Sequence, residues 1–325
     1  VDLQFNYFYA SSYDLLLDRN ISSVYGSSIY YDNTAEISTQ GYEFALRLNP
    51  VHTRDFDWVI AGNIATAKST VESLGNAQTQ DIIEFKSYNE DDAQVITKVG
   101  RSPYEFYGYE TAGVYATTEE ALASGLKNSY GNNYRGGDVR FIDQNHDGVI
   151  NDEDRISLGS ATPDFFGGLS TTFRYKWISL KADFGYSVGN KAYNATRRMN
   201  ESMSTFYNQS TSVLNRWQLE GQVTDMPRAA YGDPSGNNFF SDRWVEDASY
   251  FKLRALTLAF HFDNKMLKFC QSGTIYVTGE NLFTATDYLG SDPEFNYSYN
   301  ESMRGFDYAK VSLPITIKVG FNLNF

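Results

Sequence analysis

The residues best suited to chemistry lie in an acidic loop at positions 143–154, with the sequence DQNHDGVINDED. Oxygen-bearing side chains stand at its first, third, fifth and twelfth positions, and Gly148 stands at the sixth. With a backbone carbonyl from the seventh, this spacing gathers six or seven oxygens around one hard cation. The loop therefore predicts a calcium site with the ligands Asp143, Asn145, Asp147, Val149 and Asp154.

The pattern leaves a second interpretation open for this loop. Asp154 stands where glutamate commonly gives bidentate closure, so the loop also fits an acidic turn that faces solvent. If calcium binds, we expect a structural role. All the ligands are then used on one ion, and no nucleophile or base lies near in the sequence.

Catalytic patterns do not occur in the rest of the sequence. The three histidines, His52, His146 and His261, have neither metal-ligand nor triad spacing. The glycine pairs at 136–137 and 167–168 lack the companion residues of a phosphate loop or a nucleophile elbow. The sequence therefore predicts no enzyme.

The elements that must position the acidic loop are strands, and the clearest of them is the ribbon at 311–325. Its odd positions are all apolar and its even positions are all small or polar. Because successive side chains of a strand point to opposite faces, one face is apolar and the other wettable. The apolar face meets a second sheet in a soluble sandwich, or lipid in a membrane barrel, where about 9–11 tilted residues cross the hydrocarbon.

Composition argues against some partners and fold classes. There are 27 basic and 40 acidic residues, and the net charge of −13 argues against a nucleic-acid partner, because phosphates would be repelled. The 25 Tyr and 23 Phe fit the aromatic girdles of a barrel as well as a soluble all-β fold. No run approaches the roughly 18 apolar residues of a transmembrane helix.

Eight segments alternate in the manner of strands: 1–9, 42–48, 56–64, 169–177, 178–188, 250–262, 274–283 and 311–325. Long loops are predicted at 14–33, 73–163, 189–248 and 284–307, and short turns near 49–55, 176–178 and 263–273. Long loops and short turns therefore alternate, which places them at opposite ends of the strands. This favours an all-β, antiparallel, up-and-down transmembrane barrel over a sandwich.

Three smaller features are also predicted. A short helix is expected at 118–123, with Gly125 ending it, and partly helical structure is expected around 212–220. The alternation slips near Ala255, which indicates a β-bulge. It flips between Trp177 and Ile178, as a tight hairpin requires.

Several segments together resemble the C-terminal part of SusC/RagA-like TonB-dependent outer-membrane transporters of Bacteroidetes. The segments are GDVRFID at 137–143 running into the acidic loop and Asp154-Arg155, TPDFFGGL at 162–169, VEDASYFKLR at 245–254, GENLFT at 279–284 leading to Tyr288, Gly290 and DPE at 292–294, and the terminal Phe325. They follow the family's order over nearly two hundred residues, and the first 130 residues fit as earlier strands of the same barrel.

The resemblance implies a barrel of about 22 strands, of which this chain, residues 1–325, would supply the C-terminal eight or so. It also implies an N-terminal plug, energy supplied through TonB, and a SusD-like surface lipoprotein that captures oligosaccharide or peptide. The chain departs from the family by being short: the plug, the TonB box and the earlier strands are not in it. Phe325 would serve as the C-terminal assembly signal of the barrel.

The predicted function is therefore import across the outer membrane, with lipid around the wall and cargo in a chamber shaped by the loops. We expect Tyr193, Tyr207, Trp217 and Trp244 to stack on sugar or peptide, unless they simply pack the loop that carries them. The alternative function is a structural or assembly scaffold of an outer-membrane complex built on the same barrel.

Overall fold

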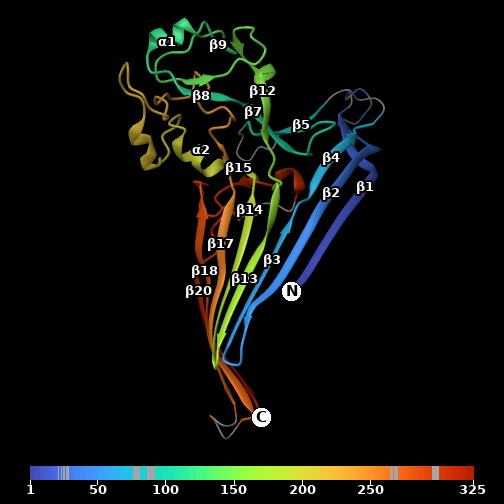
Figure 1. The fold of residues 1–325 in the computed structure, drawn as a ribbon. Coiled ribbons are helices and arrows are strands. Elements are labelled where there is room, and N and C mark those ends of the chain that lie inside the picture. Colours follow the sequence, from blue (N-terminus) through green and yellow to red (C-terminus); the bar gives the residue numbers. More distant parts are fainter. Residues whose placement is uncertain are drawn as a thin grey trace.

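The computed structural model describes residues 1–20, 22, 24, 26, 29–75, 81–85, 92–263, 266, 270–294 and 300–325. Its main element is one antiparallel sheet in the order β1-β2-β3-β13-β14-β17-β18-β20, with β4 also paired to β2 (Figure 1). The strands of this sheet are β1 (Asp2–Asn20), β2 (Ile29–His52), β3 (Phe56–Ala65), β4 (Lys68–Ser73), β13 (Phe165–Tyr175), β14 (Ile178–Val188), β17 (Tyr250–Asp263), β18 (Ser272–Thr286) and β20 (Thr316–Asn324).

The remaining elements are short and belong to the long connections. The strands are β5 (Ile82–Phe85), β6 (Gln94–Thr97), β7 (Glu105–Tyr109), β8 (Thr111–Val114), β9 (Lys127–Asn128), β10 (Val139–Phe141), β11 (Val149–Ile150), β12 (Arg155–Gly159), β15 (Lys191–Asn194), β16 (Val245–Asp247) and β19 (Phe306–Asp307). The helices are α1 (Thr118–Ala123) and α2 (Ala195–Glu201), with 3₁₀ turns η2 (Asp152–Asp154), η3 (Thr211–Asn215) and η4 (Glu301–Met303). Of the helices in the described part of the chain, none combines the length and the apolar character needed to cross a membrane.

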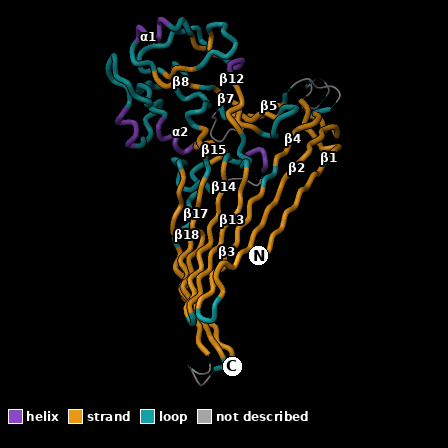
Figure 2. The backbone as a smooth tube through the Cα atoms, viewed as in Figure 1, coloured by secondary structure: helices purple, strands orange, loops and turns teal. Residues whose placement is uncertain are grey.

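Connections of different length lie at opposite ends of the sheet, as predicted. Residues 53–55 join β2 to β3 and residues 176–177 join β13 to β14, and both turns lie at the end where the chain terminates (Figure 2). The two long excursions, between β3 and β13 and between β14 and β17, fold at the other end. We refer to these as the turn end and the loop end.

The strand registers place the apolar side chains on one face of the sheet. Phe321 of β20 lies opposite Ile275, Ile275 opposite Phe260, and Phe260 opposite Ile178 of β14. The same alignment recurs in the other strands, as where Leu3 lies opposite Leu46. In the described part of the chain no second layer covers this face, and Phe321 is 74% exposed. A sandwich would bury these side chains, so the sandwich interpretation is wrong.

The sheet is open. Among the described residues β1 pairs only with β2, and β20 pairs only with β18, so the two edge strands do not pair with each other. The chain alone is therefore a curved section of a wall and not a closed eight-stranded barrel. Lys318 and Glu280 lie on the other, polar face, where they form an ion pair.

Two predicted boundaries are wrong. Strand β20 begins at Thr316 and not at Val311, although the apolar alternation continues back to Val311. Pro314 lies in the intervening stretch, and proline has no N–H to donate to a neighbouring strand. The predicted loop at 14–33 is largely strand, because β1 and β2 stay paired from Asn20 and Ile29 inwards; several residues of 21–28 lie outside the described residues.

Of the smaller predictions, some are confirmed and one is wrong in part. Helix α1 has the predicted bounds, and its N-cap Thr117 accepts a hydrogen bond from the backbone of Glu120. The bulge near Ala255 is confirmed by a register shift between Leu253 and Ala255. Helical structure around 212–220 is confined to the 3₁₀ turn η3, whereas α2 was not predicted. Phe325 is exposed, and its role as an assembly signal stays a prediction.

Candidate functional site

The two long excursions pack on each other at the loop end, and we call their described residues within 81–163 and 189–249 the cap (Figure 1). Backbone hydrogen bonds join them, from Tyr109 N to Phe240 O at 2.9 Å and from Asp242 N to Tyr109 O at 3.0 Å. The hydroxyl of Thr118 donates to Glu220 at 2.6 Å. Segments about a hundred residues apart in sequence therefore form one folded unit.

Asp138 is the most buried link between the two excursions. Its carboxylate accepts hydrogen bonds from Arg228 Nε at 2.7 Å, Ser235 Oγ at 3.0 Å and Asn237 Nδ2 at 3.2 Å, and its side chain is fully buried. The preceding Gly137 has a φ of +84°, and a Cβ there would lie 2.5 Å from the Trp217 ring. The Gly-Asp pair at 137–138 is thus required by close packing and by a buried charge network.

A second charge network surrounds the half-buried Asp92. Arg198 forms a hydrogen-bonded ion pair with this carboxylate, Arg155 lies 3.5 Å from it, and Phe240 N donates to it at 3.1 Å. Burial alone would raise the pKa of Asp92, but Arg198 and the Phe240 N–H outweigh burial and lower it. The same ion pair, with Tyr193, raises the pKa of Arg198 against the opposing effect of burial.

Tyr193 and Trp244 belong to the hydrophobic core of the cap, so their predicted contact with cargo is wrong. Both are 0% exposed and pack with Phe106, Phe240 and Phe306. Tyr193 meets Phe240 edge to face at 4.9 Å between ring centroids. Aromatic rings bury large areas, and this core gives a reason for their abundance in these loops that does not involve a ligand.

The other two predicted cargo residues differ from each other. Trp217 lies over Gly136 and Gly137, and its Nε1 donates to Ala116 O at 2.9 Å, so it packs the two excursions together. Tyr207 is 78% exposed. Of the four residues predicted to contact cargo, Tyr207 has the most accessible ring.

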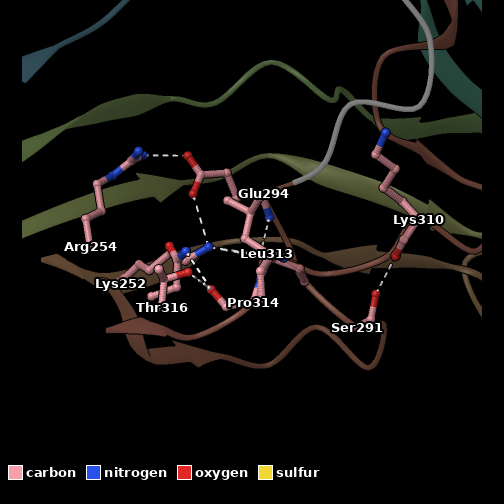
Figure 3. A network of polar contacts seen from close by, with 10 residues as sticks. Lys252, Arg254, Ser291, Glu294, Lys310, Leu313, Pro314 and Thr316 are labelled. Atoms are coloured by element: carbon pink, nitrogen blue, oxygen red, sulfur yellow. Dashed lines mark hydrogen bonds and ion pairs between the residues drawn. The ribbon is translucent and has the colours of Figure 1, made fainter. Parts of the chain in front are cut away.

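A third network ties the loop end of the wall to the connection between β18 and β20 (Figure 3). Lys252 of β17 is 2% exposed, and its Nζ lies 3.2 Å from Asp292 and 3.3 Å from Glu294. Arg254 binds the other oxygen of Glu294 at 2.5 Å. Two acids and two bases therefore hold this connection against the polar face of the wall.

Glu246 fixes the cap to the same rim. It accepts hydrogen bonds from Arg197 of α2 at 2.9 Å, from Asn194 at 3.2 Å and from the backbone of Leu289 at 2.8 Å. Ala248, between β16 and β17, donates its N–H to Asn190 O and so joins the two ends of the second excursion. The segment 245–254 is thus the joint between wall, cap and the β18–β20 connection.

Part of the acidic loop has a conformation that would suit a bound cation. His146 and Gly148 have φ values of +61° and +84°. The N–H groups of both residues donate to the Asp143 carboxylate, at 2.7 and 2.9 Å. Burial would raise the pKa of Asp143, but these backbone donors lower it, which keeps the carboxylate ionised.

The remaining predicted ligands are only partly gathered. The buried Asp154 accepts from the backbone of Gln144 and Asn151, whereas Asn145 donates its amide to Asp147 at 3.2 Å and Glu153 at 3.1 Å. Among the described residues no three acidic, histidine or cysteine side chains converge as a metal cluster. Any ion would therefore depend on Asn145 Oδ1 and the Val149 carbonyl as well as on the acids.

The sequence did not indicate a role for Asp92, Asp138, Lys252 or Asp292. Three of them lie inside the segments that carried the family resemblance, but their partners are 40 or more residues away in sequence. The one local signal was a charge at a strand position next to apolar neighbours, as for Lys252 between Phe251 and Leu253. A charge at such a position predicts an oppositely charged partner nearby, but it does not identify the partner residue.

The open sheet with an apolar outer face, and with folded loops at one end, defines a section of a transmembrane β-barrel. Comparison with curated proteins agrees. The TonB-dependent receptor P3 of Formosa agariphila is 30% identical over all of this chain, and the TonB-dependent receptor SusC of Bacteroides thetaiotaomicron is 23% identical over 90% of it. The chain is thus a relative of the TonB-dependent receptors, which are outer-membrane proteins, and resembles one section of a SusC-type receptor.

Solved structures show the same fold. The RagAB peptide importer in its open-open state matches 99% of this chain with a TM-score of 0.77 at 20% identity. The chain spans about a third of the relatives' length, since it covers 32% of receptor P3 and 32% of the matched RagAB chain. No family model matches the sequence.

Proposed function

We propose that this chain forms part of the wall and of the outer cap of a TonB-dependent importer in the outer membrane. The observation that carries this proposal is the single apolar face shared by all the wall strands, together with a cap folded only at the loop end. Lipid would cover the apolar face, and water and cargo would meet the polar face. In the whole receptor, further strands would pair with β1 and β20 and close the wall.

The partners follow from the relatives and are part of the same proposal. A SusD-like lipoprotein would cover the cap, TonB would act through an N-terminal part of the kind that the family has, and the cargo would be an oligosaccharide or a peptide. SusC and the RagAB peptide importer support this assignment by their names. The exposed rings of Phe206, Tyr207 and Tyr231 support it chemically, because exposed aromatic groups mark contact surfaces.

Uptake in cells tests the import function. We expect uptake of labelled oligosaccharides or peptides to require the gene for the intact receptor and to stop when the proton-motive force is dissipated. The control is the same strain carrying the gene on a plasmid. Undiminished uptake after deletion, with the protein found instead in a stable envelope complex, would support the scaffold function and contradict import.

We also propose that the acidic loop binds calcium in a structural role. The ligand types and the folding of the loop on Asp143 support this. A ligand that binds only the folded state stabilises it by about 2.7 kcal/mol at a hundred times its dissociation constant. Its effect should be confined to the cap, because Ile150 of this loop is buried in the second core cluster of the cap.

Thermal unfolding of the purified receptor with calcium or with a chelator measures this effect. We expect calcium to raise the unfolding temperature of the wild type and of the control Glu119→Ala, which removes an exposed acid of α1 outside the loop. The double variant Asp143→Ala/Asp147→Ala should lose the calcium dependence. An equal response of both variants to calcium would reject the site.

A further inference from the structure

A hollow of about 680 Å³ lies between helix α2, the turn η3 and the connection from β18 to β20. Its walls come from residues 194–201, 210–212, 289–291 and 307–312, so it sits at the loop end where cap and wall meet. Most of its lining residues are Ser, Asn, Thr or charged residues, although carbon atoms make up most of the exposed lining surface. Such a lining suits a ligand with an apolar body and a few polar groups.

Both carboxylates of the hollow are already satisfied. Glu201 accepts from Arg197 at 3.0 Å and from Ser212 Oγ at 2.7 Å. Asp307 is 2% exposed and accepts from Tyr288 at 2.7 Å and from the backbone of Lys310 at 3.0 Å. The acceptors of the hollow therefore have little capacity left for a ligand.

The lining also contains hydrogen-bond donors that have no partner in the described part of the protein. Three exposed residues of the lining, Lys310, Asn200 and Ser312, have side chains that form no hydrogen bond or ion pair with the described part of the protein. Figure 3 shows the Lys310 ammonium pointing away from the Lys252 network. A lysine ammonium offers three donors and no acceptor, so the unused capacity of the hollow is cationic.

Lys310 is also held in place. Its N–H donates to Asp307 at 3.0 Å and its carbonyl accepts from Ser291 at 2.7 Å. The preceding Ala309 has a φ of +58°, an uncommon conformation for alanine, and its N–H donates to Thr196 at 2.7 Å. These contacts fix the backbone from which the exposed side chain of Lys310 projects.

We propose that this hollow is a subsite for a carboxylate group of the cargo and that Lys310 determines its specificity. The proposal deepens the import function and rests on it. With a net charge of −13 the chain repels anions in general, so an anionic group needs a local unpaired cation such as this one. The carboxylate would accept from the Lys310 ammonium and from the amide of Asn200.

Binding to the intact, detergent-purified receptor tests the proposal by calorimetry with two pairs of probes. One pair is tri-galacturonic acid and its neutral methyl ester, and the other is tri-alanine and its C-terminal amide, because a carboxylate can come from a sugar acid or from a peptide. We expect at least one acid to bind about tenfold more tightly than its neutral partner, as a charge-assisted hydrogen bond predicts. Equal affinities within both pairs would overturn the proposal.

Variants of Lys310 test whether the preference for the acid over its neutral partner arises in the hollow. We expect Lys310→Gln to reduce the acid preference to less than about twofold, and Lys310→Arg to keep it. The matched control Lys127→Gln removes the same charge from an exposed lysine of β9 in the cap and should keep the preference. A preference that survives Lys310→Gln would overturn the assignment.

These binding measurements need neither TonB nor a membrane potential. Uptake that does not depend on the receptor, together with an intact acid preference in binding, would therefore contradict import alone. Receptor-dependent uptake without an acid preference would contradict this subsite alone.

Discussion

At the scale of residues, this chain depends on a few buried charges that join distant segments. Lys252 connects a wall strand to Asp292 and Glu294, and Asp138 connects the two excursions of the cap. Removing one partner from such a group leaves a charge without compensation away from water, which costs more than the pair itself contributes. These positions should therefore be much more sensitive to substitution than the exposed ion pairs.

Replacing Lys252 with methionine tests this at the wall. We expect Lys252→Met to lower the free energy of unfolding by about 3–5 kcal/mol, because Asp292 and Glu294 lose their buried counter-ion. Chemical denaturation of the intact receptor measures it. The control is Lys181→Met on the neighbouring strand, where the Lys181–Asp183 pair is partly exposed and should contribute less than about 1 kcal/mol. Equal effects of the two variants would contradict the burial argument.

Acid should weaken the cap through Asp92. Its pKa is lowered in the folded protein from its ordinary 3.8, so its contribution to stability is fully present above that value. The contribution is lost as the pH falls through the lower folded-state pKa. We expect a loss of cap stability below about pH 4, measured by hydrogen exchange at residues 92–97 and 195–201. The loss should be smaller in Asp92→Asn, and an identical pH profile would contradict this.

At the scale of elements, each wall strand has two faces that meet different surroundings. Leu169 of β13 lies on the apolar face opposite Phe184, and the adjacent Ser170 lies on the polar face opposite Asp183. In a bilayer the first position meets hydrocarbon and the second meets water. The same substitution at these neighbouring positions should therefore have different effects.

Arginine substitutions at these two positions distinguish the lipid-facing side of the wall from the water-facing side. We expect Leu169→Arg to destabilise the receptor by about 2–4 kcal/mol in phospholipid bilayers, with less effect towards the membrane surface. Ser170→Arg should have a small effect, because Asp183 is opposite and compensates the charge. Denaturant unfolding in vesicles measures both. A larger effect at Ser170 would mean that the two faces are assigned the wrong way round.

At the scale of the whole molecule, the excursions are not independent loops but one cap that is attached to the wall. Hydrophobic clusters fill the cap, the two largest around Phe240 and Phe141, and Glu246 with Lys252 fixes its base to the rim. The polar face of the wall and the base of the cap therefore meet at the loop end. A cargo group that enters the hollow beside Lys310 lies at this boundary.

Hydrogen exchange can measure whether the two excursions of the cap unfold together. We expect Asp138→Asn to reduce hydrogen-exchange protection in both 111–141 and 226–240 by about 3 kcal/mol, because Arg228 loses its buried carboxylate. Arg140→Met, which removes the more exposed pair with Glu120, should leave both segments protected. Loss of protection in only one segment would show that the excursions fold independently.

The strand pattern, the short helix at 118–123 and the bulge near Ala255 could be predicted because their signals are local. Alternation has a period of two residues and capping spans about four, so neither needs information from elsewhere in the chain. The ends of β1, β2 and β20 could not be placed from alternation alone. Their extent depends on which residues find a neighbouring strand.

The sequence by itself determined which side chains share a face of the wall, since a strand imposes that order regardless of its partners. Only the tertiary structure decided which aromatic residues of the loops are accessible. It buries Tyr193 and Trp244 among rings that come from three distant segments, and leaves Tyr207 exposed. Burial is decided by neighbours brought together in space, and sequence spacing carries no record of those neighbours.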